Sequence, residues 1–345
     1  MKTLLNGADV SMLPALERAG AVFRDDSGKP ADALRVMADH GASVFRLRLF
    51  VNPSKDFNAC WGAVQDLDEV RALAKRVKDV GAKTLLCLHY SDTWADPMHQ
   101  TKPAAWRDLP FDALERAVEQ YTHDVLATLA SDGVTPAFVQ IGNEIAPGML
   151  WPDGRVGVVK DDSGQREEFG RLARLLGAGI RATRGVDPAI RITIHTHGGG
   201  QPGVPTWFFK RLAEHALDFD TIGLSFYPYG GEKVPVLKQC VDDLIATHAK
   251  DVWIVETGYP WFDASSLTKD KTDAGFAWPR TPEGQAAFLR DLLDTVRAAK
   301  DGRCLGVLWW YPEAIPTPGL HIYRGGSDAL FDREGKPLPA MALLK

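Results

Sequence analysis

Short apolar runs recur along the chain, and each is followed by a longer segment with helical periodicity. The runs lie at residues 4–10, 44–51, 83–90, 137–144, 190–196, 221–228, 251–258 and 304–311. Their interiors are nearly continuous apolar sequences, such as TLLCL, AFVQI and VWIVE, which is typical of strands covered on both faces. The pattern therefore predicts eight buried, parallel strands.

Helical patterns fill the intervals between the predicted strands. We expect helices at residues 31–40, 66–80, 111–130, 166–183, 205–217, 234–248 and 281–300, and a short eighth helix at 339–345. The segment at 66–80 opens with acidic residues, which suit the positive end of a helix dipole. Thr281 directly precedes Pro282, as expected of an N-cap residue followed by proline at the first helical position.

The regular alternation of strands and helices predicts an α/β protein with a single (β/α)8 TIM barrel, in one catalytic domain over residues 1–345. A doubly wound open sheet is the main alternative. Such a sheet usually carries a glycine-rich phosphate loop after its first strand, and GADVSML is not a loop of that kind. The barrel is therefore the favoured architecture.

Composition narrows the range of partners. The formal net charge is −5 and no basic run occurs, so we expect no nucleic-acid partner. No apolar run is long enough to predict a membrane span. The opening MKTLLNGADVSML lacks a signal peptide, which predicts a cytoplasmic protein, or a secreted or periplasmic one whose signal has been removed. We expect a monomer. We also expect the four cysteines to be buried free thiols, because no two have metal-ligand spacing and Cys87 and Cys304 lie inside apolar runs.

Polar or aromatic residues end most of the predicted strands. They are Arg46 and Arg48 on the second strand, His89 and Tyr90 on the third, Asn143 and Glu144 on the fourth, His195 and His197 on the fifth, Tyr227 on the sixth, Glu256 on the seventh, and Trp309, Trp310 and Tyr311 on the eighth. The active site of a (β/α)8 barrel forms at the C-terminal ends of its strands, so we expect these residues to meet at one rim.

Glu144 and Glu256 each follow a buried apolar strand. A carboxylate in that position is shielded from bulk water, so it needs partners or a raised pKa. A lone Glu at a strand end more often holds a loop through an ion pair, but two on one rim favour paired chemistry. Cleavage of a glycosidic bond uses such a pair, because one carboxylic acid protonates the leaving oxygen while the other carboxylate attacks the anomeric carbon or activates water. A separation of about 5–5.5 Å between the carboxyl groups would indicate retention of configuration.

Longer segments of the chain resemble a known family. They are GADVSMLPALERAG, FRLRLFVNP, HYSDTWADP, FVQIGNEIAPGMLWPDG, SFYPYG, IVETGYPW, TPEGQ and ALFDREGKPLP. Together they resemble glycoside hydrolase family 53, the endo-β-1,4-galactanases, within the large clan of retaining glycosidases on (β/α)8 barrels. The matching segments run from the first strand to the C-terminus, and HYSDTWADP and QIGNEIAPGMLWP are the specific ones.

The resemblance implies cleavage of internal β-1,4-galactosidic bonds in galactan or type I arabinogalactan with retention, with Glu144 as general acid/base and Glu256 as nucleophile. Arg46 would contact the nucleophile, and Trp94, Trp151 and Trp310 would provide stacking surfaces. The substrate-binding residues are then Arg46, Arg48, His89, Asp92, Trp94, Asn143, Trp151, His195, Tyr227, Trp261 and Trp310. The expected partner is a polysaccharide or oligosaccharide.

The chain departs from the family pattern at three places. Strand eight usually ends Tyr-Trp-Glu-Pro, and here Tyr311 replaces the glutamate; strand five commonly ends His-Leu-Asp, and here it ends His195-Thr196-His197. The loop at 262–280 is unlike the Asp/Gly-rich loop that resembles a calcium-holding loop in bacterial members. We therefore expect no cofactor and no catalytic metal; a structural calcium is the alternative, and this loop does not support it. The departures make a different β-linked polysaccharide or oligosaccharide the alternative substrate.

Two rival interpretations lie outside this class of enzyme. His195 and His197 point to the same side of a strand, which is the arrangement that a metal-dependent barrel hydrolase would use. Such an enzyme needs further ligands from other strands, and no Asp ends strand eight. A non-catalytic carbohydrate-binding barrel is the other rival, and the intact pair of glutamates argues against it.

Overall fold

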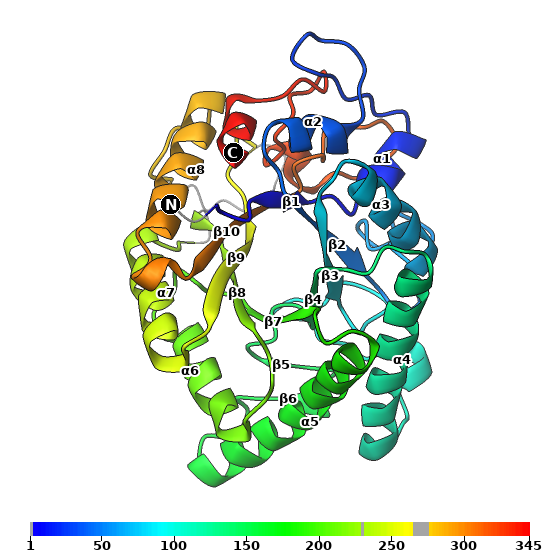
Figure 1. Cartoon of the computed structure of the whole chain (residues 1–345), viewed down its shortest axis with the longest axis vertical. Helices are drawn as coiled ribbons and strands as arrows, with labels where there is room; N and C mark the ends of the chain where they lie inside the picture. Colours follow the sequence, from blue (N-terminus) through cyan, green and yellow to red (C-terminus); the bar gives the residue numbers. More distant parts are fainter. Residues whose placement is uncertain (1–2, 229–230, 265–275) are drawn as a thin grey trace.

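The computed structural model describes residues 3–228, 231–264 and 276–345. Eight parallel strands form a closed barrel in the order β1-β10-β9-β8-β7-β4-β3-β2 (Figure 1). They are β1 (Gly7–Asp9), β2 (Val44–Leu49), β3 (Lys83–Leu88), β4 (Phe138–Ile141), β7 (Arg191–Thr196), β8 (Thr221–Phe226), β9 (Asp251–Thr257) and β10 (Cys304–Trp310). Each predicted strand contains one barrel strand, so the predicted (β/α)8 fold is confirmed, with the strand ends predicted too long.

Helices surround the barrel and separate successive strands (Figure 1). They are α1 (Leu13–Arg18), α2 (Ala33–Asp39), α3 (Leu67–Asp79), α4 (Phe111–Ser131), α5 (Asp162–Val186), α6 (Val204–Leu212), α7 (Val234–His248) and α8 (Pro282–Arg297). Short 3-10 segments are η1 (Ala104–Trp106), η2 (Ala213–His215), η4 (Lys300–Gly302), η5 (Tyr323–Gly326) and η6 (Pro339–Leu344). The predicted eighth helix is therefore the 3-10 segment η6.

Helix caps explain where the predictions for helices succeeded and failed. The hydroxyl of Thr281 accepts a hydrogen bond from the backbone N–H of Gly284, which confirms the predicted N-cap of α8. Asp161 caps α5 in the same way, so this helix begins four residues before the predicted start. The pattern missed the six-residue α1 and the small hairpin of β5 (Gly148–Met149) and β6 (Gly154–Arg155), which lie in loops after β1 and β4.

Side chains along each strand alternate between two cores. Outward-facing residues such as Leu47, Leu86 and Ile194 pack in the large apolar core between the barrel and its helices. Inward-facing residues form a second cluster, which we call the barrel plug: Val44, Leu85, Cys87, Phe138, Trp253, Val255, Leu305 and Leu308. The indole N–H of Trp253 donates to the carbonyl of Leu5 (3.2 Å), which ties the plug to the chain that enters β1.

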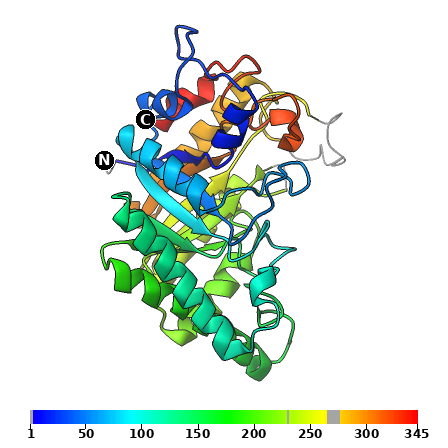
Figure 2. The ribbon, with the colours of Figure 1, turned by 90° about the vertical axis from the view of Figure 1, so that its right-hand side faces the viewer.

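Inward positions nearer the C-terminal ends of the strands are polar. Arg46, Arg48, Gln140, His195 and Ser225 are all buried there. The plug is therefore apolar, while the layer above it carries charge and hydrogen-bonding groups. Figure 2 shows that the two termini lie together on one side of the molecule and that the connections that follow the strands extend to the other side.

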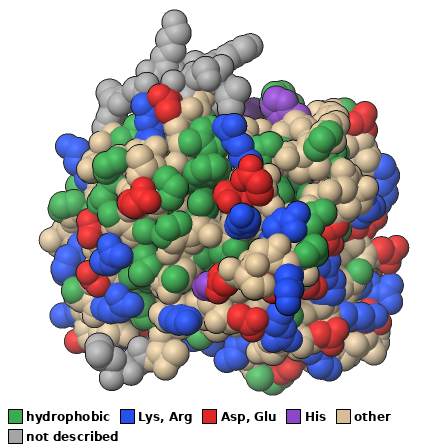
Figure 3. All heavy atoms as spheres, turned by 90° about the horizontal axis from the view of Figure 1, so that it is seen from above, with side chains coloured by type: hydrophobic (Ala, Val, Ile, Leu, Met, Phe, Trp, Pro, Cys, Tyr) green, Lys and Arg blue, Asp and Glu red, His purple; other side chains and the backbone are tan. Residues whose placement is uncertain are grey.

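The distribution of surface charge, the helices and the cysteines bear on the predictions about partners, membrane spans and thiols. Basic and acidic side chains are interspersed on the face shown in Figure 3. None of the described helices combines the length and the apolar character that a membrane span requires. All four cysteines are free; Cys87, Cys240 and Cys304 are buried as predicted, whereas Cys60 is partly exposed, so that prediction was wrong for Cys60.

Replacement of Gly7 by alanine should destabilise the barrel. A Cβ atom at Gly7 would lie 1.7 Å from the carbonyl oxygen of Val44, its neighbour on β2, so the two strands would have to separate. We expect a loss of about 1–3 kcal/mol or more in the free energy of unfolding, measured by denaturant titration. Gly185→Ala in α5 is the matched control, because no atom lies within 4 Å of the added Cβ and a helix favours alanine over glycine. Equal stability of the two variants would contradict this account of β1.

Candidate active site

A cavity of about 430 Å³ opens at the C-terminal ends of the barrel strands. It is lined by Met12, Arg48, Trp61, His89, Trp94, Ala95, Asp96, Asn143, Glu144, Tyr227, Glu256, Trp310, Tyr311, His321 and Tyr323. Eight of these are residues predicted for the site, and they come from β2, the ends of β9 and β10, and the segments that follow β3, β4 and β8. The structure thus brings most of the predicted rim residues together around one cavity.

Left-handed backbone geometry brings Glu144 into the cavity. After β4 ends at Ile141, Gly142 has φ +78° and Glu144 has φ +50°. A left-handed conformation is costly for a residue with a side chain and is common where function requires a particular orientation. Tyr90 (φ +50°) and Tyr311 (φ +62°) share it just after β3 and β10, so the chain turns in the same way at three strand ends.

A β-bulge turns Glu256 inward. Trp253 and Val255 both belong to the barrel plug, so strict alternation would direct Glu256 toward the helices. The pairing of β8 with β9 shifts by one residue between Leu224 and Ser225, and Ser225 then pairs with Glu256. The extra residue reverses the alternation, and two consecutive residues, Val255 and Glu256, face the barrel interior.

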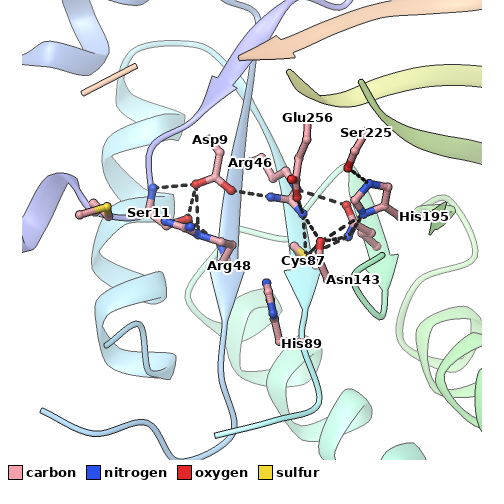
Figure 4. A network of polar contacts seen from close by, with 12 residues as sticks. Asp9, Ser11, Arg46, Arg48, Cys87, His89, Asn143, His195, Ser225 and Glu256 are labelled. Atoms are coloured by element: carbon pink, nitrogen blue, oxygen red, sulfur yellow. Dashed lines mark hydrogen bonds and ion pairs between the residues drawn. The ribbon is translucent and has the colours of Figure 1, made fainter. Parts of the chain in front are cut away.

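Arg46 is the centre of the buried polar network beneath the cavity (Figure 4). Its guanidinium group forms ion pairs with Asp9 (Nη1 to Oδ2, 2.7 Å) and with Glu256 (Nη2 to Oε1, 2.8 Å). It also donates to Asn143 Oδ1 (2.7 Å) and to Gln140 Oε1 (3.2 Å). One buried cation therefore holds two carboxylates and fixes the orientation of the residue that precedes Glu144.

The two glutamates lie in different electrostatic environments. Burial raises the pKa of Glu144 above its ordinary value, and the charge of Glu256 raises it further. Burial also raises the pKa of Glu256, but Arg46 opposes this shift, and so does the hydroxyl of Tyr227, which donates to Glu256 Oε2 at 3.2 Å. Arg46 lowers the pKa of both carboxyl groups, but it forms a direct ion pair with Glu256 alone, and the hydroxyl of Tyr227 also stabilises the Glu256 anion. Glu144 therefore retains its proton to higher pH than Glu256 does.

A chain of hydrogen bonds orients the carboxyl group of Glu144. The backbone N–H of Glu144 (3.3 Å) and the amide of Gln140 (3.0 Å) both donate to His195 Nδ1, so the imidazole proton lies on Nε2. Nε2 contacts Ser225 Oγ at 2.9 Å, and Ser225 donates to Glu144 Oε1 at 2.6 Å. Burial lowers the pKa of His195 far below its ordinary value, which keeps this histidine neutral.

His89 and Arg48 present donors on the cavity side of the network. His89 Nδ1 accepts from the backbone N–H of Ala95 (3.1 Å), so its proton lies on Nε2, which is buried and has no partner in the described structure. The guanidinium of Arg48 lies between the rings of Trp94 (4.5 Å) and Tyr311 (4.9 Å), with Asp9 at 3.3 Å from its Nε. These cationic and aromatic groups form the wall of the cavity on the side of β2 and β10.

Several predicted substrate-binding residues do not line the cavity. Asp92 accepts hydrogen bonds from the backbone N–H groups of Asn52 (2.9 Å) and Ala104 (2.8 Å), so it connects two loops. The indole N–H of Trp151 donates to Pro147 O (3.0 Å), and that of Trp261 donates to Gly326 O (3.2 Å). Arg46 and His195 are fully buried below the cavity and act through the residues that line it.

Sequence reasoning missed several residues of the site. Asp9, Ser225 and Glu313 are buried in the network, and Trp61, His321 and Tyr323 lie on the rim. Asp9 ends the first strand, so it carries the same signal as the polar residues predicted at the ends of the other strands. Ser225 and Trp61 carry no comparable signal, since one is a small residue inside a strand and the other lies in a long loop.

Contacts of His195 argue against the metal-dependent alternative. Both ring nitrogens of His195 already have protein partners, so neither has a lone pair directed at a metal ion. Within residues 3–228, 231–264 and 276–345, no group of three or more His, Cys, Asp or Glu side chains could hold a metal. Most of the loop expected to differ from a calcium-holding loop, residues 265–275, lies outside the described residues.

Comparison with known proteins agrees with the resemblance. A family model described as glycosyl hydrolase family 53 matches residues 5–344. An uncharacterised protein of Niallia circulans is 37% identical, over 98% of this chain and 93% of its own length. An arabinogalactan endo-beta-1,4-galactanase of Cellvibrio japonicus is 34% identical, over 98% of this chain and 90% of its own length. The GH53 catalytic domain of Ignisphaera aggregans has a similar structure, with a TM-score of 0.89, 30% identity and coverage of 99% of this chain and 95% of that domain.

Ser225→Ala should raise the pKa of Glu144. The serine hydroxyl donates to the carboxylate and stabilises its charged form, so loss of this bond favours the protonated form. We expect the carboxyl signal of Glu144 in carbon-13 NMR to titrate at higher pH in this variant than in the wild type. Ser225→Thr keeps a hydroxyl at the same place and serves as the control. An unchanged or lower pKa in Ser225→Ala would show that the 2.6 Å contact does not govern Glu144.

Proposed function

Because the chain belongs to glycosyl hydrolase family 53, it is a glycoside hydrolase, and we propose that it cleaves internal β-1,4-galactosidic bonds of galactan or type I arabinogalactan with retention of configuration. Glu144 is the general acid/base in this proposal and Glu256 is the nucleophile. The substrate class comes from the relative in Cellvibrio japonicus, which is described as an arabinogalactan endo-beta-1,4-galactanase.

One observation carries the assignment of the two roles. The carboxylate of Glu256 forms an ion pair with Arg46 and accepts a hydrogen bond from the hydroxyl of Tyr227. The carboxyl group of Glu144 instead accepts a hydrogen bond from the neutral hydroxyl of Ser225. A nucleophile has to be ionised and a general acid has to be protonated at the same pH. The positive charge of Arg46 therefore supports Glu256 as the nucleophile, and the higher proton affinity of Glu144 supports it as the acid.

The first half of the reaction forms a covalent intermediate. A carboxylate oxygen of Glu256 attacks the anomeric carbon of the sugar, the bond from that carbon to the glycosidic oxygen breaks, and Glu144 gives its proton to the departing oxygen. Tyr227 and Arg46 hold the nucleophile in position during the attack. The rate should fall as the pH rises through the pKa of Glu144, because the acid is then deprotonated.

The second half releases the sugar. Glu144, now a carboxylate, takes a proton from a water molecule, and the water oxygen attacks the anomeric carbon from the face that the leaving group occupied. The bond to Glu256 breaks and the carboxylate regains its ion pair with Arg46. Two inversions at one carbon give net retention, and the rate should fall as the pH drops through the pKa of Glu256.

The charge balance of the site supports a neutral sugar as substrate. Arg46 and Arg48 carry two positive charges, and Asp9 and Glu256 carry two negative charges in direct contact with them. Burial raises the pKa of Glu313, which lies close to this group, to about 8, so its carboxyl is largely neutral at pH 7. Asp96, which also lines the cavity, is a further acidic residue, so these groups leave no excess of positive charge to attract an acidic sugar. The galactose units of a β-1,4-galactan are uncharged and therefore suit this site.

A substrate screen with anomeric analysis tests the proposed function. We expect the purified protein to release oligosaccharides from β-1,4-galactan and from type I arabinogalactan, and to act poorly on mannan and β-glucans. Proton NMR during the first minutes should show the β-anomer as the initial product, since the reaction retains configuration. Preferred cleavage of another β-linked polysaccharide would replace the substrate assignment, and initial formation of the α-anomer would exclude the double displacement.

Removal of either glutamate should give a distinct chemical rescue. Glu256→Ala should lose at least about 10³-fold in kcat with no change in fold, because no covalent intermediate forms. Azide enters the space left by the nucleophile and should restore turnover with an α-glycosyl azide as product. Glu144→Ala should instead yield a β-glycosyl azide, because azide then attacks the intermediate in place of water. Near wild-type activity of Glu256→Ala, or exchanged azide products, would contradict the assigned roles.

A further inference from the structure

Trp61 is exposed at the rim of the cavity. The residue retains 64% of its accessible surface; it lies in the long loop after β2 and lines the cavity. Isolated exposed apolar residues are common and need no explanation. This residue is unusual because its backbone has φ +54°, a left-handed conformation that a residue with a side chain adopts only where surrounding contacts impose it.

Contacts from two neighbouring loops hold Trp61 in this position. The indole N–H of Trp94 donates to the carbonyl of Trp61 (3.1 Å). The ring of His321, from the loop after β10, packs edge-on against the Trp61 ring with 4.6 Å between their centroids. Asn58 joins the two loops, because its amide donates to Gly319 O (2.7 Å) and accepts from the backbone N–H of His321 (2.8 Å). The backbone of Trp61 is therefore held by Trp94, and its ring is supported by His321, without any ligand.

Further aromatic rings line the cavity that Trp61 shares with the catalytic glutamates. Trp310, at the end of β10, packs against Tyr323 with 5.2 Å between their ring centroids, and both line the same cavity as Trp61. Tyr227 also packs against Trp310 (6.2 Å) and donates to Glu256. One cavity therefore has aromatic rings beside the nucleophile and, at its rim, the exposed indole of Trp61.

The order of strands places Trp61 across the barrel from the acid. Trp61 and His321 follow β2 and β10, which flank β1, and β1 lies four strands away from β7 in either direction around the closed barrel. Glu144 follows β4 and bonds to Ser225 on β8, the two strands that flank β7. A general acid has to lie beside the oxygen of the leaving group, so the leaving group occupies the β7 side. The sugar that becomes attached to Glu256 then extends toward Trp61.

We propose that Trp61 and His321 form a distal subsite, which stacks on the apolar face of a β-linked galactosyl unit on the non-reducing side of the cleaved bond. This inference rests on the proposed function for the identity of the sugar. The flat C–H face of a galactose ring matches a flat, exposed indole, and burial of both surfaces from water provides the binding energy. The subsite favours chains with several galactose units before the bond that is cleaved.

Trp61→Ala tests the subsite through its dependence on chain length. With galactooligosaccharides, we expect kcat/KM to fall about tenfold for the tetraose, pentaose and hexaose, which corresponds to about 1.4 kcal/mol of stacking. The value for 4-nitrophenyl β-galactoside, which has one sugar before the bond, should stay within about twofold of the wild type. Trp61→Phe keeps an aromatic face and should lose less. Cleavage of the long chains should also shift toward their non-reducing ends.

Val158→Ala is the matched control, because Val158 is also an exposed apolar residue but lies outside the cavity lining. It should leave all substrates unaffected, and thermal unfolding should show that all three variants fold. An equal loss on every chain length, or no loss on any, would overturn the subsite. If the wild type cleaves a different β-linked polysaccharide, the galactan assignment fails, and the same comparison with oligosaccharides of that polysaccharide still decides the role of Trp61.

Discussion

A single buried cation organises the upper half of this barrel. The guanidinium group of Arg46 is fully buried, and a charge in that position is tolerated only when it is paired and fully hydrogen-bonded. Asp9 and Glu256 provide the charges, while Asn143, Gln140 and the sulfur of Cys87 provide further acceptors. Five strands, β1, β2, β3, β4 and β9, thereby meet at one group. The same group sets the orientation of Asn143 and the ionisation of Glu256, so the architecture and the chemistry depend on one interaction.

This arrangement explains why the two glutamates differ in proton affinity. The carboxylate of Glu256 forms an ion pair with Arg46. The carboxyl group of Glu144 instead bonds to the hydroxyl of Ser225, which is next to the neutral His195. Two chemically identical side chains therefore acquire different proton affinities within one cavity. The hydrogen bonds of His195 matter here because they fix its tautomer, which leaves Ser225 free to donate to Glu144.

The sequence predicted the strands and which of them carry functional groups, because apolar runs and the residues that end them are local properties. Local properties do not predict which of those side chains point into the barrel. Glu256 faces inward only because a bulge shifts the pairing of β8 with β9, and Glu144 does so only because its backbone is left-handed. Ser225 and Trp61 acquire their partners from distant segments. Asp92, Trp151 and Trp261 follow specific motifs, yet their contacts lie within loops and outside the cavity lining.

The division of the barrel interior into an apolar plug and a polar upper layer has a consequence for how such a protein diverges. Residues of the plug, such as Trp253 and Phe138, are buried in close-packed surroundings, where even small changes in volume cost stability. The rim residues Trp61 and His321 lie in loops that follow the strands and are not part of that cluster. Mutations that alter sugar preference can therefore accumulate at the rim with little loss in the free energy of unfolding. New specificities can then evolve while the barrel itself stays unchanged.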